Sequence, residues 1–569
     1  MNSRTIRQRL WVTNWICFSL VVFVNPLSIG AGTIAGTGSV SGQVEAQKPF
    51  QAAQVQFMNV DKNVLFMVYT NAGRYQAVNL FPGNYEVSVV KRGFAAEPRK
   101  IAVKAGDTMT VDFTLREAAS QEQQPGSFGG PQGRAEQVQL VPYDQLYPPG
   151  PTREKLEKTC IYCHGMGFIP GRKWTTETAN EAIDLMGVAD AKTLRQVMIP
   201  PGTLTPQDRE NIVEYLTKNY GPDSPRRGLR VDAEFPVDET VLAKAMYVEY
   251  YLPLDPKLDA NNRQRRGQDP YFDKDGNVWY TDRSIPNRVG RLDPRTGAFK
   301  DYVLPDPKAD PHGLVVDAEG QVFWAEVQGF QLGRLDPKSG EMTRYPMDSS
   351  GENAGRGHTP IVDSQQNIWY TAIAGDMIGK WDRKTQKTKV WKVPTPGAAP
   401  YGIVLDKDEN VWFAEFRRCK VAKFDPRTEK FTEFPALSQP CLILRLSVAP
   451  DGFVWYAIFS GGKIGKVDPA TGKTVEYTVP MPFSEPYDIW PDHDGYLWVS
   501  DGGQGGALMR FDPRTEKFTY FPTPQRTDQP KVQITKEGAI WYNPRSSGKG
   551  AVGVLYPDVS KMTTFAAYE

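Results

Sequence analysis

Seven copies of one pattern fill the C-terminal half of this 569-residue chain. In each copy a large aromatic side chain follows a turn, and successive copies lie 43 to 46 residues apart. The seven positions are Trp279, Phe323, Trp369, Trp412, Trp455, Trp498 and Trp541. Each copy also contains a strand-like run that ends in a turn, as in VGRLDPRTG and LGRLDPKSG. Four short strands in a period of about 40 to 45 residues are typical of a β-propeller, so residues 269–569 are predicted to form seven blades.

The connector before the repeats, residues 222–268, contains one more strand-like run. Residues 246–256, MYVEYYLPLDP, are predicted to form a strand that closes the ring against the final blade. The run MTTFAAYE at the C-terminus is the alternative outer strand of that blade. The sequence leaves both arrangements open.

Cys160, Cys163 and His164 form the run CIYCHG. In a Cys-x-x-Cys-His motif the two thiols add to the vinyl groups of a haem, and the histidine supplies an axial nitrogen to the iron. A redox disulfide and half of a zinc site are the alternatives, but the first usually lies in a βαβ unit and the second needs another ligand pair nearby. The motif therefore predicts one covalent haem c.

The sixth iron ligand is predicted to be Met198, with Met186 as the second choice. Met198 precedes two prolines and a helix that begins at the N-cap Thr205 and ends at Gly221. This arrangement resembles the end of small class I cytochromes c. The resemblance implies an α-helical cytochrome c domain at residues 151–221, with a Met/His pair that suits electron transfer.

The N-terminus indicates export. Arginines precede an apolar run and then small residues, so residues 1–36 are predicted to be a secretory signal, with an uncleaved membrane anchor as the alternative. Because haem c is attached outside the cytoplasm, the expected compartment is a bacterial periplasm. An oxidising compartment allows Cys419 and Cys441 to pair, although two buried thiols are the alternative. A net charge of +1 argues against a nucleic-acid partner.

Residues 37–118 alternate apolar and polar positions in short runs, which predicts a small all-β domain. The runs NAGRYQAVNLFPGNYEVSV and DTMTVDFTL resemble the carboxypeptidase regulatory-like β-sandwich family. Residues 119–150 are rich in Gln, Gly, Pro and Ser and are predicted to be a flexible linker. The predicted fold class is therefore multidomain and mainly β: a small β-sandwich, an α-helical cytochrome c domain and a seven-bladed β-propeller.

The repeat units DPHGLVVDAEGQVFWAE and APYGIVLDKDENVWFAE resemble the streptogramin B (virginiamycin B) lyase family of seven-bladed propellers. The resemblance implies that His312 is a general base and that Asp310 and Glu326 hold Mg²⁺ or another divalent cation. The family has a second histidine one blade before the first, and this chain has Gln268 at that position. One blade after His312 it has His358, which is a further catalytic candidate. The equivalent positions in other blades should converge on the same mouth; they are Asp282, Tyr401, Glu415, Tyr487 and Asp501.

Three functions follow from these patterns. The first is an exported haem protein for electron transfer, whose propeller binds a small-molecule substrate or a periplasmic redox partner. The second is a metal-dependent lyase with an appended cytochrome. The third is a non-enzymatic docking platform. The residues at the propeller mouth should distinguish an oxidoreductase from a Mg²⁺-dependent lyase. Membrane attachment is expected only if the N-terminal segment is not cleaved.

Overall fold

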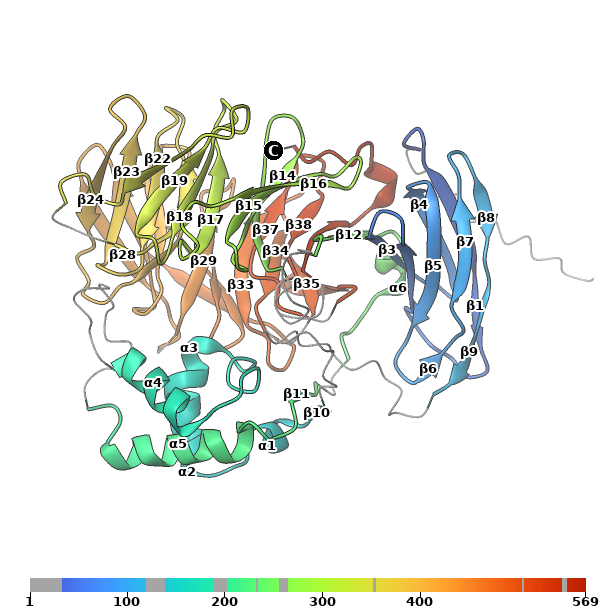
Figure 1. Cartoon of the computed structure of the whole chain (residues 1–569), viewed down its shortest axis with the longest axis horizontal. Coiled ribbons are helices and arrows are strands. Elements are labelled where there is room, and N and C mark those ends of the chain that lie inside the picture. The colour runs from blue at the N-terminus through green and yellow to red at the C-terminus, as the bar shows by residue number, and fades with distance from the viewer. Residues whose placement is uncertain are drawn as a thin grey trace, which may run out of the picture.

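The computed structural model describes residues 33–118, 139–187, 202–231, 234–254, 265–351, 355–439, 441–503, 506–525, 527–544 and 550–568. Most of the predicted signal, residues 119–138 of the predicted linker, and Met198 lie outside these ranges. The described chain is mainly β, with a sandwich, a helical segment and a propeller-like domain (Figure 1). No helix in these ranges has the length and apolar character that a membrane span needs.

Six four-stranded antiparallel sheets succeed one another along the propeller. From inner to outer strand they are β13–β16 (Gly267–Phe272, Val278–Asp282, Arg288–Asp293, Ala298–Val303), β17–β20 (Pro311–Val316, Val322–Glu326, Gln331–Leu335, Met342–Pro346), β21–β24 (Gly357–Val362, Ile368–Ala372, Met377–Asp382, Lys387–Lys392), β25–β28 (Pro400–Leu405, Val411–Glu415, Lys420–Asp425, Lys430–Pro435), β29–β32 (Ile443–Val448, Val454–Ile458, Lys463–Val467, Thr474–Thr478) and β33–β36 (Pro486–Pro491, Leu497–Asp501, Ala507–Asp512, Lys517–Pro522). The repeated aromatic residue of each blade lies on its second strand.

The seventh blade takes its outer strand from the connector. It is built from β37 (Val532–Ile534), β38 (Ile540–Tyr542), β39 (Ala551–Tyr556) and β12 (Met246–Tyr251). Strand β12 pairs antiparallel with β39 over its whole length. Residues 562–568 form no strand and follow a short 3₁₀ helix, Val559–Lys561. The connector strand thus closes the ring, and the alternative closure by MTTFAAYE is wrong.

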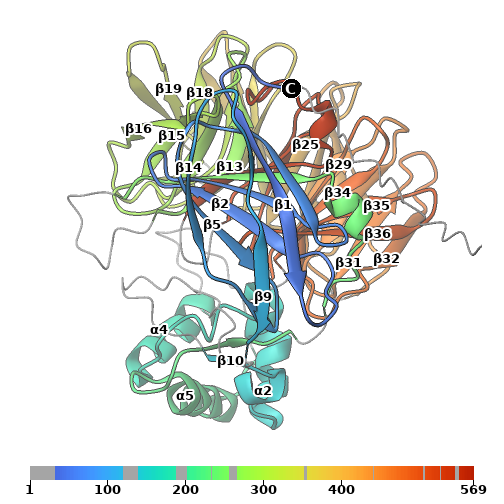
Figure 2. The same cartoon turned by 90° about the vertical axis from the view of Figure 1, so that its right-hand side faces the viewer.

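The other edge of β12 pairs with β3 of the N-terminal sandwich (Figure 1), and Figure 2 shows the sandwich strands in front of the propeller. The sandwich strands are β1 (Gly38–Ala46), β2 (Gln54–Asn59), β3 (Val64–Tyr69), β4 (Arg74–Leu80), β5 (Gly83–Val90), β6 (Phe94–Ala95), β7 (Arg99–Val103), β8 (Thr108–Thr110) and β9 (Phe113–Glu117). Because β12 pairs with both β39 and β3, one eight-stranded sheet runs β37-β38-β39-β12-β3-β2-β5-β7. The second sheet of the sandwich is β4-β1-β9-β6, with β8 beside β1.

Apolar side chains fix the sandwich to the propeller. The Phe565 ring, near the C-terminus, lies 4.7 Å from the Phe81 ring and 6.5 Å from the Phe66 ring, measured between centroids. Tyr250 of β12 stacks on Trp541 at 6.3 Å. These residues belong to one buried cluster that includes both sandwich and blade side chains. The two β domains therefore share a sheet and a core, which should make them unfold together.

The repeated glycine of the third strand has a packing reason. In five blades this glycine lies directly opposite an aromatic residue of the second strand; blade four has alanine opposite phenylalanine, and blade six has methionine opposite valine, so the two sizes are complementary in all seven. The pairs are Tyr280–Gly290, Trp324–Gly333, Tyr370–Gly379, Phe413–Ala422, Tyr456–Gly465, Val499–Met509 and Tyr542–Gly553. A Cβ added at Gly379 would meet the ring of Tyr370. The small residue leaves room for the aromatic ring to lie across the neighbouring strand.

Gly379→Met should destabilise the propeller by about 3 kcal/mol, because overpacking a filled core typically costs 1 to 3 kcal/mol. Adding Tyr370→Val should recover part of that loss, since the pair would then match Val499 and Met509 of blade six. Urea unfolding of the two single variants and the double variant measures the coupling. Additive losses would contradict the size-complementary pairing.

The helical segment covers one end of the propeller (Figure 1). A continuous helical run consists of α2 (Pro151–Leu156), a π-type turn (Glu157–Ile161) and α3 (Tyr162–His164). The other helices are α1 (Tyr143–Leu146), α4 (Thr176–Gly187), α5 (Pro206–Tyr220) and α6 (Glu239–Leu242), and the short strands β10 (Gln139–Val141) and β11 (Arg227–Leu229) pair with each other. As predicted, Thr205 caps α5 through a capping box with Asp208, and Gly221 ends the helix.

The predicted fold class is nevertheless wrong in one part, because an α-helical cytochrome c domain is not supported. Only about 10% of the chain is described as helical. The helical segment is also joined to the β domain: Leu156, Ile161 and Ile212 belong to one buried cluster with side chains of two propeller blades, including Trp455 and Ile489. This cluster brings together segments that are far apart in the sequence, which the helix pattern alone could not reveal.

Cys419 and Cys441 are free thiols in the structure. Both are buried and adjacent: the Cys441 amide donates to Cys419 Sγ at 2.5 Å, and the Cys419 thiol donates to the Cys441 carbonyl at 2.6 Å. The sequence allowed either a disulfide or two buried thiols, and the structure has two buried thiols.

Candidate functional site

The second residues of six inner strands meet at one end of the propeller channel. They are Gln268, His312, His358, Tyr401, Leu444 and Tyr487, and we call them the helical-side mouth. Hydrogen bonds between blades fix the register: Thr281 Oγ1 donates to the His312 carbonyl and Thr371 Oγ1 donates to the Tyr401 carbonyl, both at 2.6 Å. The equivalence of repeat positions thus places residues from separate blades around one axis.

Two histidines and two tyrosines form a connected group in this mouth. The His312 and His358 rings lie 3.8 Å apart, and the His358 and Tyr401 rings 3.7 Å apart, between centroids. The hydroxyls of Tyr401 and Tyr487 lie 2.5 Å apart. His312 and His358 are only 5% and 2% exposed. Burial lowers the pKa of His358 well below its usual value, and His312 and Arg445 lower it further, so His358 is neutral at pH 7.

The two carboxylates expected to bind a cation are each paired with an arginine instead. Arg283 donates to both oxygens of Asp310, at 2.5 and 2.7 Å. Arg344 donates to both oxygens of the buried Glu326, at 2.5 to 3.2 Å. Among the described residues no group of three or more His, Cys, Asp or Glu side chains is placed to hold a metal ion. To bind a cation here, Asp310 and Glu326 would each have to leave an arginine.

The other predicted carboxylates at this level have different surroundings. Asp282 is paired with Arg265. Asp501 accepts hydrogen bonds from the Glu485 amide at 3.0 Å and the Gly503 amide at 2.8 Å. Burial raises the pKa of Glu415 to about 8, and the nearby carboxylate of Glu433 contributes to the rise. These residues surround the channel without forming one cluster.

The CIYCHG segment packs against this same mouth. The Met166 amide donates to Glu485 Oε1 at 3.1 Å, and Tyr162 packs against a buried cluster that contains Phe459 and Tyr487. Gly165 has a φ of +74° directly after α3, and a Cβ there would lie 2.8 Å from Glu485 Oε2. The turn after His164 therefore depends on glycine both for its backbone conformation and for its close approach to the propeller.

His164 lies in a largely buried position beside two other side chains. Its ring stacks on Phe168 at 4.0 Å between centroids, and the Arg172 guanidinium lies 4.1 Å from the centre of the Phe168 ring. Burial, assisted by Arg172, lowers the pKa of His164 to about 4. Cys160 is a free, half-buried thiol whose pKa burial raises. Met186 is half-buried at the end of α4, whereas Met198 lies outside the described residues.

Glu485 is a site residue that the sequence reasoning missed. Glu485 lies two residues before Tyr487, just as Asp310 lies two residues before His312. The register of the repeat could therefore have identified it. Among the described residues no arginine pairs with it as Arg283 pairs with Asp310, and it accepts a hydrogen bond from the Met166 amide. Burial raises its pKa to about 8, and the nearby Asp501 raises it further.

Glu485 should make the stability of the chain depend on pH. An acid whose pKa is raised in the folded state stabilises the fold below the unfolded-state pKa, near 4.5, and loses that contribution as the pH rises towards about 8. Thermal unfolding followed by circular dichroism should give a midpoint that falls from about pH 5 to about pH 8, and Glu485→Gln should reduce that fall. The exposed Glu516→Gln serves as the control. An equal fall in the wild type and Glu485→Gln would contradict this assignment.

Two family models match the chain. The virginiamycin B lyase family matches residues 268–510 and 331–563, and the carboxypeptidase regulatory-like domain matches residues 37–116. Neither match covers residues 117–267, which contain the helices and CIYCHG. No curated protein sequence matches the chain significantly.

Solved structures of this kind are similar over the propeller. A streptogramin B lyase is 22% identical, with 55% of this chain and 97% of that chain covered and a TM-score of 0.48. A catalytically inactive virginiamycin B lyase from Staphylococcus aureus, solved with quinupristin, is 20% identical, with 55% and 99% covered and a TM-score of 0.49. The family matches together span more than half of this chain, which therefore belongs, through its propeller, to the virginiamycin B lyase family.

Proposed function

We propose that this chain carries one covalent haem c on the CIYCHG segment and that the helical-side mouth is the binding surface this haem serves in electron transfer. The observation that carries the proposal is the contact between the two. The turn that follows His164 donates a hydrogen bond to Glu485 of the propeller, and Tyr162 packs into the mouth. A group attached at this segment would therefore lie beside the mouth.

The residues present fit such a group. Cys160 is a free thiol, and its helical run puts it within one turn of Cys163 and His164. His164 is held in the neutral form, which is the form that binds iron. The stacked Phe168 ring fixes the plane of the imidazole. Haem supplies one-electron redox chemistry when it is bound.

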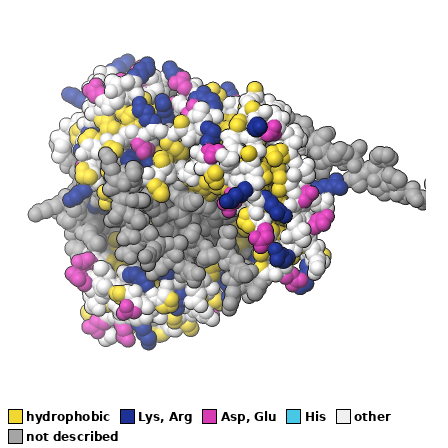
Figure 3. Space-filling model, turned by 45° about the vertical axis from the view of Figure 1, so that its right-hand side comes forward, with side chains coloured by type: hydrophobic (Ala, Val, Ile, Leu, Met, Phe, Trp, Pro, Cys, Tyr) yellow, Lys and Arg dark blue, Asp and Glu magenta, His cyan; other side chains and the backbone are white. Residues whose placement is uncertain are grey.

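In this function the chain's own residues have separable tasks. His164 would supply a ring nitrogen to the iron, and Gly165 together with Glu485 holds its turn against the propeller. The joined hydroxyls of Tyr401 and Tyr487 provide hydrogen-bonding groups for a small-molecule substrate or for a polar side chain of a redox partner. Both signs of charge are interspersed on the face in Figure 3, so no single-sign patch selects a polyanion there.

Proton abstraction by the histidine pair, as in a lyase, is the second candidate. It is favoured by the buried, neutral His358, whose ring contacts both His312 and Tyr401. A neutral imidazole accepts a proton, and the neighbouring tyrosine hydroxyl can hydrogen-bond a developing oxyanion. The arginine pairs on Asp310 and Glu326 favour a version without a bound cation.

The haem proposal is tested by producing the full chain in a bacterial host that attaches haem c in its periplasm. Purified chain should have an intact mass larger by one haem, and acidified acetone should not remove the pigment. Cys160→Ser/Cys163→Ser should lose the added mass, whereas the control Cys419→Ser/Cys441→Ser should keep it. Extractable haem, or added mass in the first double variant, would contradict covalent attachment and leave the lyase or docking functions.

A further inference from the structure

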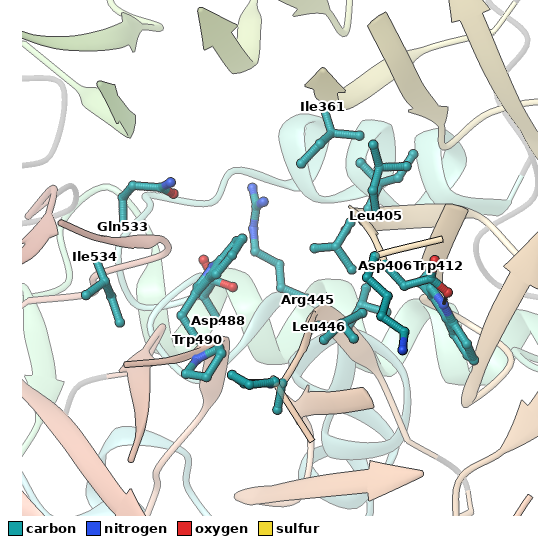
Figure 4. A pocket seen from close by; sticks show the side chains of 18 of the residues that line it. Ile361, Leu405, Asp406, Trp412, Arg445, Leu446, Asp488, Trp490, Gln533 and Ile534 are labelled. Atoms are coloured by element: carbon teal, nitrogen blue, oxygen red, sulfur yellow. Dashed lines mark hydrogen bonds between the residues drawn. The ribbon is translucent and has the colours of Figure 1, made fainter. Parts of the chain in front are cut away.

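A cavity lies at the opposite end of the channel from the helical-side mouth (Figure 4). It has a volume of about 770 Å³ and lies where the inner strands end. Apolar side chains make much of its wall, among them Ile361, Leu405, Leu446 and Trp490. We call this cavity the far pocket. Its size and apolar wall suit a small organic molecule.

The floor of the far pocket carries buried charges. Arg445 Nη2 donates to Asp269 Oδ2 at 3.1 Å, and Lys531 Nζ lies 3.7 Å from the same oxygen. Asp488 accepts the Ile489 amide at 3.0 Å and the Val532 amide at 3.3 Å. All four charged residues are at least nine-tenths buried. Two cations and two carboxylates thus close the channel between the pocket and the helical-side mouth.

Arg445 is incompletely bonded in this network. Its residue is 4% exposed, yet its Nε has no hydrogen-bond partner among the described residues. Figure 4 shows its guanidinium pointing into the pocket, away from the neighbouring Leu446. A buried charged donor without an acceptor is costly, so an acceptor supplied by a ligand would be favoured here.

We infer that the far pocket binds a small monocarboxylate with an apolar body, whose carboxylate bonds to Arg445. The planar guanidinium matches a carboxylate in geometry, and hydrogen bonds between charged groups are stronger than neutral ones. The body of the ligand would lie on Trp490, Ile361 and Leu405. Asp269 and Asp488 disfavour polyanions, so a single negative charge is the better match.

Calorimetry with phenylacetate on the full chain tests this site. Phenylacetate should bind at least about 10-fold more tightly than the neutral phenylacetamide, and Arg445→Met should weaken phenylacetate by about 10- to 100-fold. Arg427→Met, which changes an exposed arginine of blade four, should bind as the wild type does.

Arg445 also supports the charge network, so Arg445→Met could lose binding because it misfolds. A second variant tests the site without that change. Ile361→Trp fills the pocket without touching that network and should abolish phenylacetate binding while keeping the wild-type thermal unfolding midpoint. Three results would each overturn the inference: no binding to the wild type, equal binding of phenylacetamide, or wild-type binding by Ile361→Trp. Tighter binding of inorganic phosphate than of phenylacetate would also overturn it.

Discussion

Val248→Pro should unfold at a much lower urea concentration than the wild-type chain. Val248 is fully buried at the centre of β12, opposite Phe66 on one side and Val554 on the other. Proline removes a ladder hydrogen bond and places its ring against a neighbouring strand. A buried backbone acceptor left without its partner costs about 1 to 3 kcal/mol and overpacking adds a similar amount, so we expect a loss of about 3 kcal/mol or more.

Val248→Ala is the matched control, because it removes side-chain volume but keeps both backbone ladders. It should cost about 1 to 2 kcal/mol. Tryptophan fluorescence reports on the propeller and the helices, since residues 37–118 contain no tryptophan, whereas circular dichroism also reports on the sandwich. The two transitions should coincide in the wild type, where the domains share a sheet. Equal losses for proline and alanine would contradict the role of β12 as the joining strand.

The propeller could be predicted from the sequence because its signal repeats. Each tryptophan-containing strand needs the same turn before it, and a large residue on it needs a small partner on the next strand, as Tyr370 needs Gly379. The shared sheet could not be predicted in the same way. Pairing between β12 and β3 joins segments about 180 residues apart, and no local sequence feature of either strand specifies which strand it pairs with.

The candidate site was predictable to a similar degree. The repeat register placed His312 and His358 together, as the structure shows. Haem attachment at CIYCHG stays a prediction, which rests on the Cys-x-x-Cys-His pattern alone. The register could not show that Arg283 and Arg344 neutralise Asp310 and Glu326, because those arginines come from a loop and an outer strand outside the aligned positions. Nor could it show that the helices lie on the mouth, because that contact joins Met166 to Glu485 across more than 300 residues.

The haem proposal predicts that His164→Ala keeps the covalent haem but leaves the iron without its protein nitrogen. His164 has a neutral imidazole and lies next to Cys160 and Cys163, whereas His312 and His358 lie within the propeller. The absorption spectrum of the purified variant should therefore differ from that of the wild type. Added imidazole should restore a spectrum like that of the wild type in a saturable titration.

The exposed-turn variant His493→Ala is the control and should have the wild-type spectrum without imidazole. Phe168→Leu removes the ring that stacks on His164 and should produce a smaller change than His164→Ala, because the nitrogen ligand remains. A wild-type spectrum in His164→Ala would show that His164 does not bind the iron, and only the proposed attachment through Cys160 and Cys163 would then stand.

Anomalous X-ray scattering at the iron absorption edge, from crystals of the full chain, tests the placement of a haem beside the propeller mouth most directly. We expect one iron peak per chain, bonded to a ring nitrogen of His164 on the segment that Glu485 holds against the propeller. Crystals of Cys160→Ser/Cys163→Ser should lack the peak. Its absence from the wild type, or its presence at a site away from His164, would contradict the account.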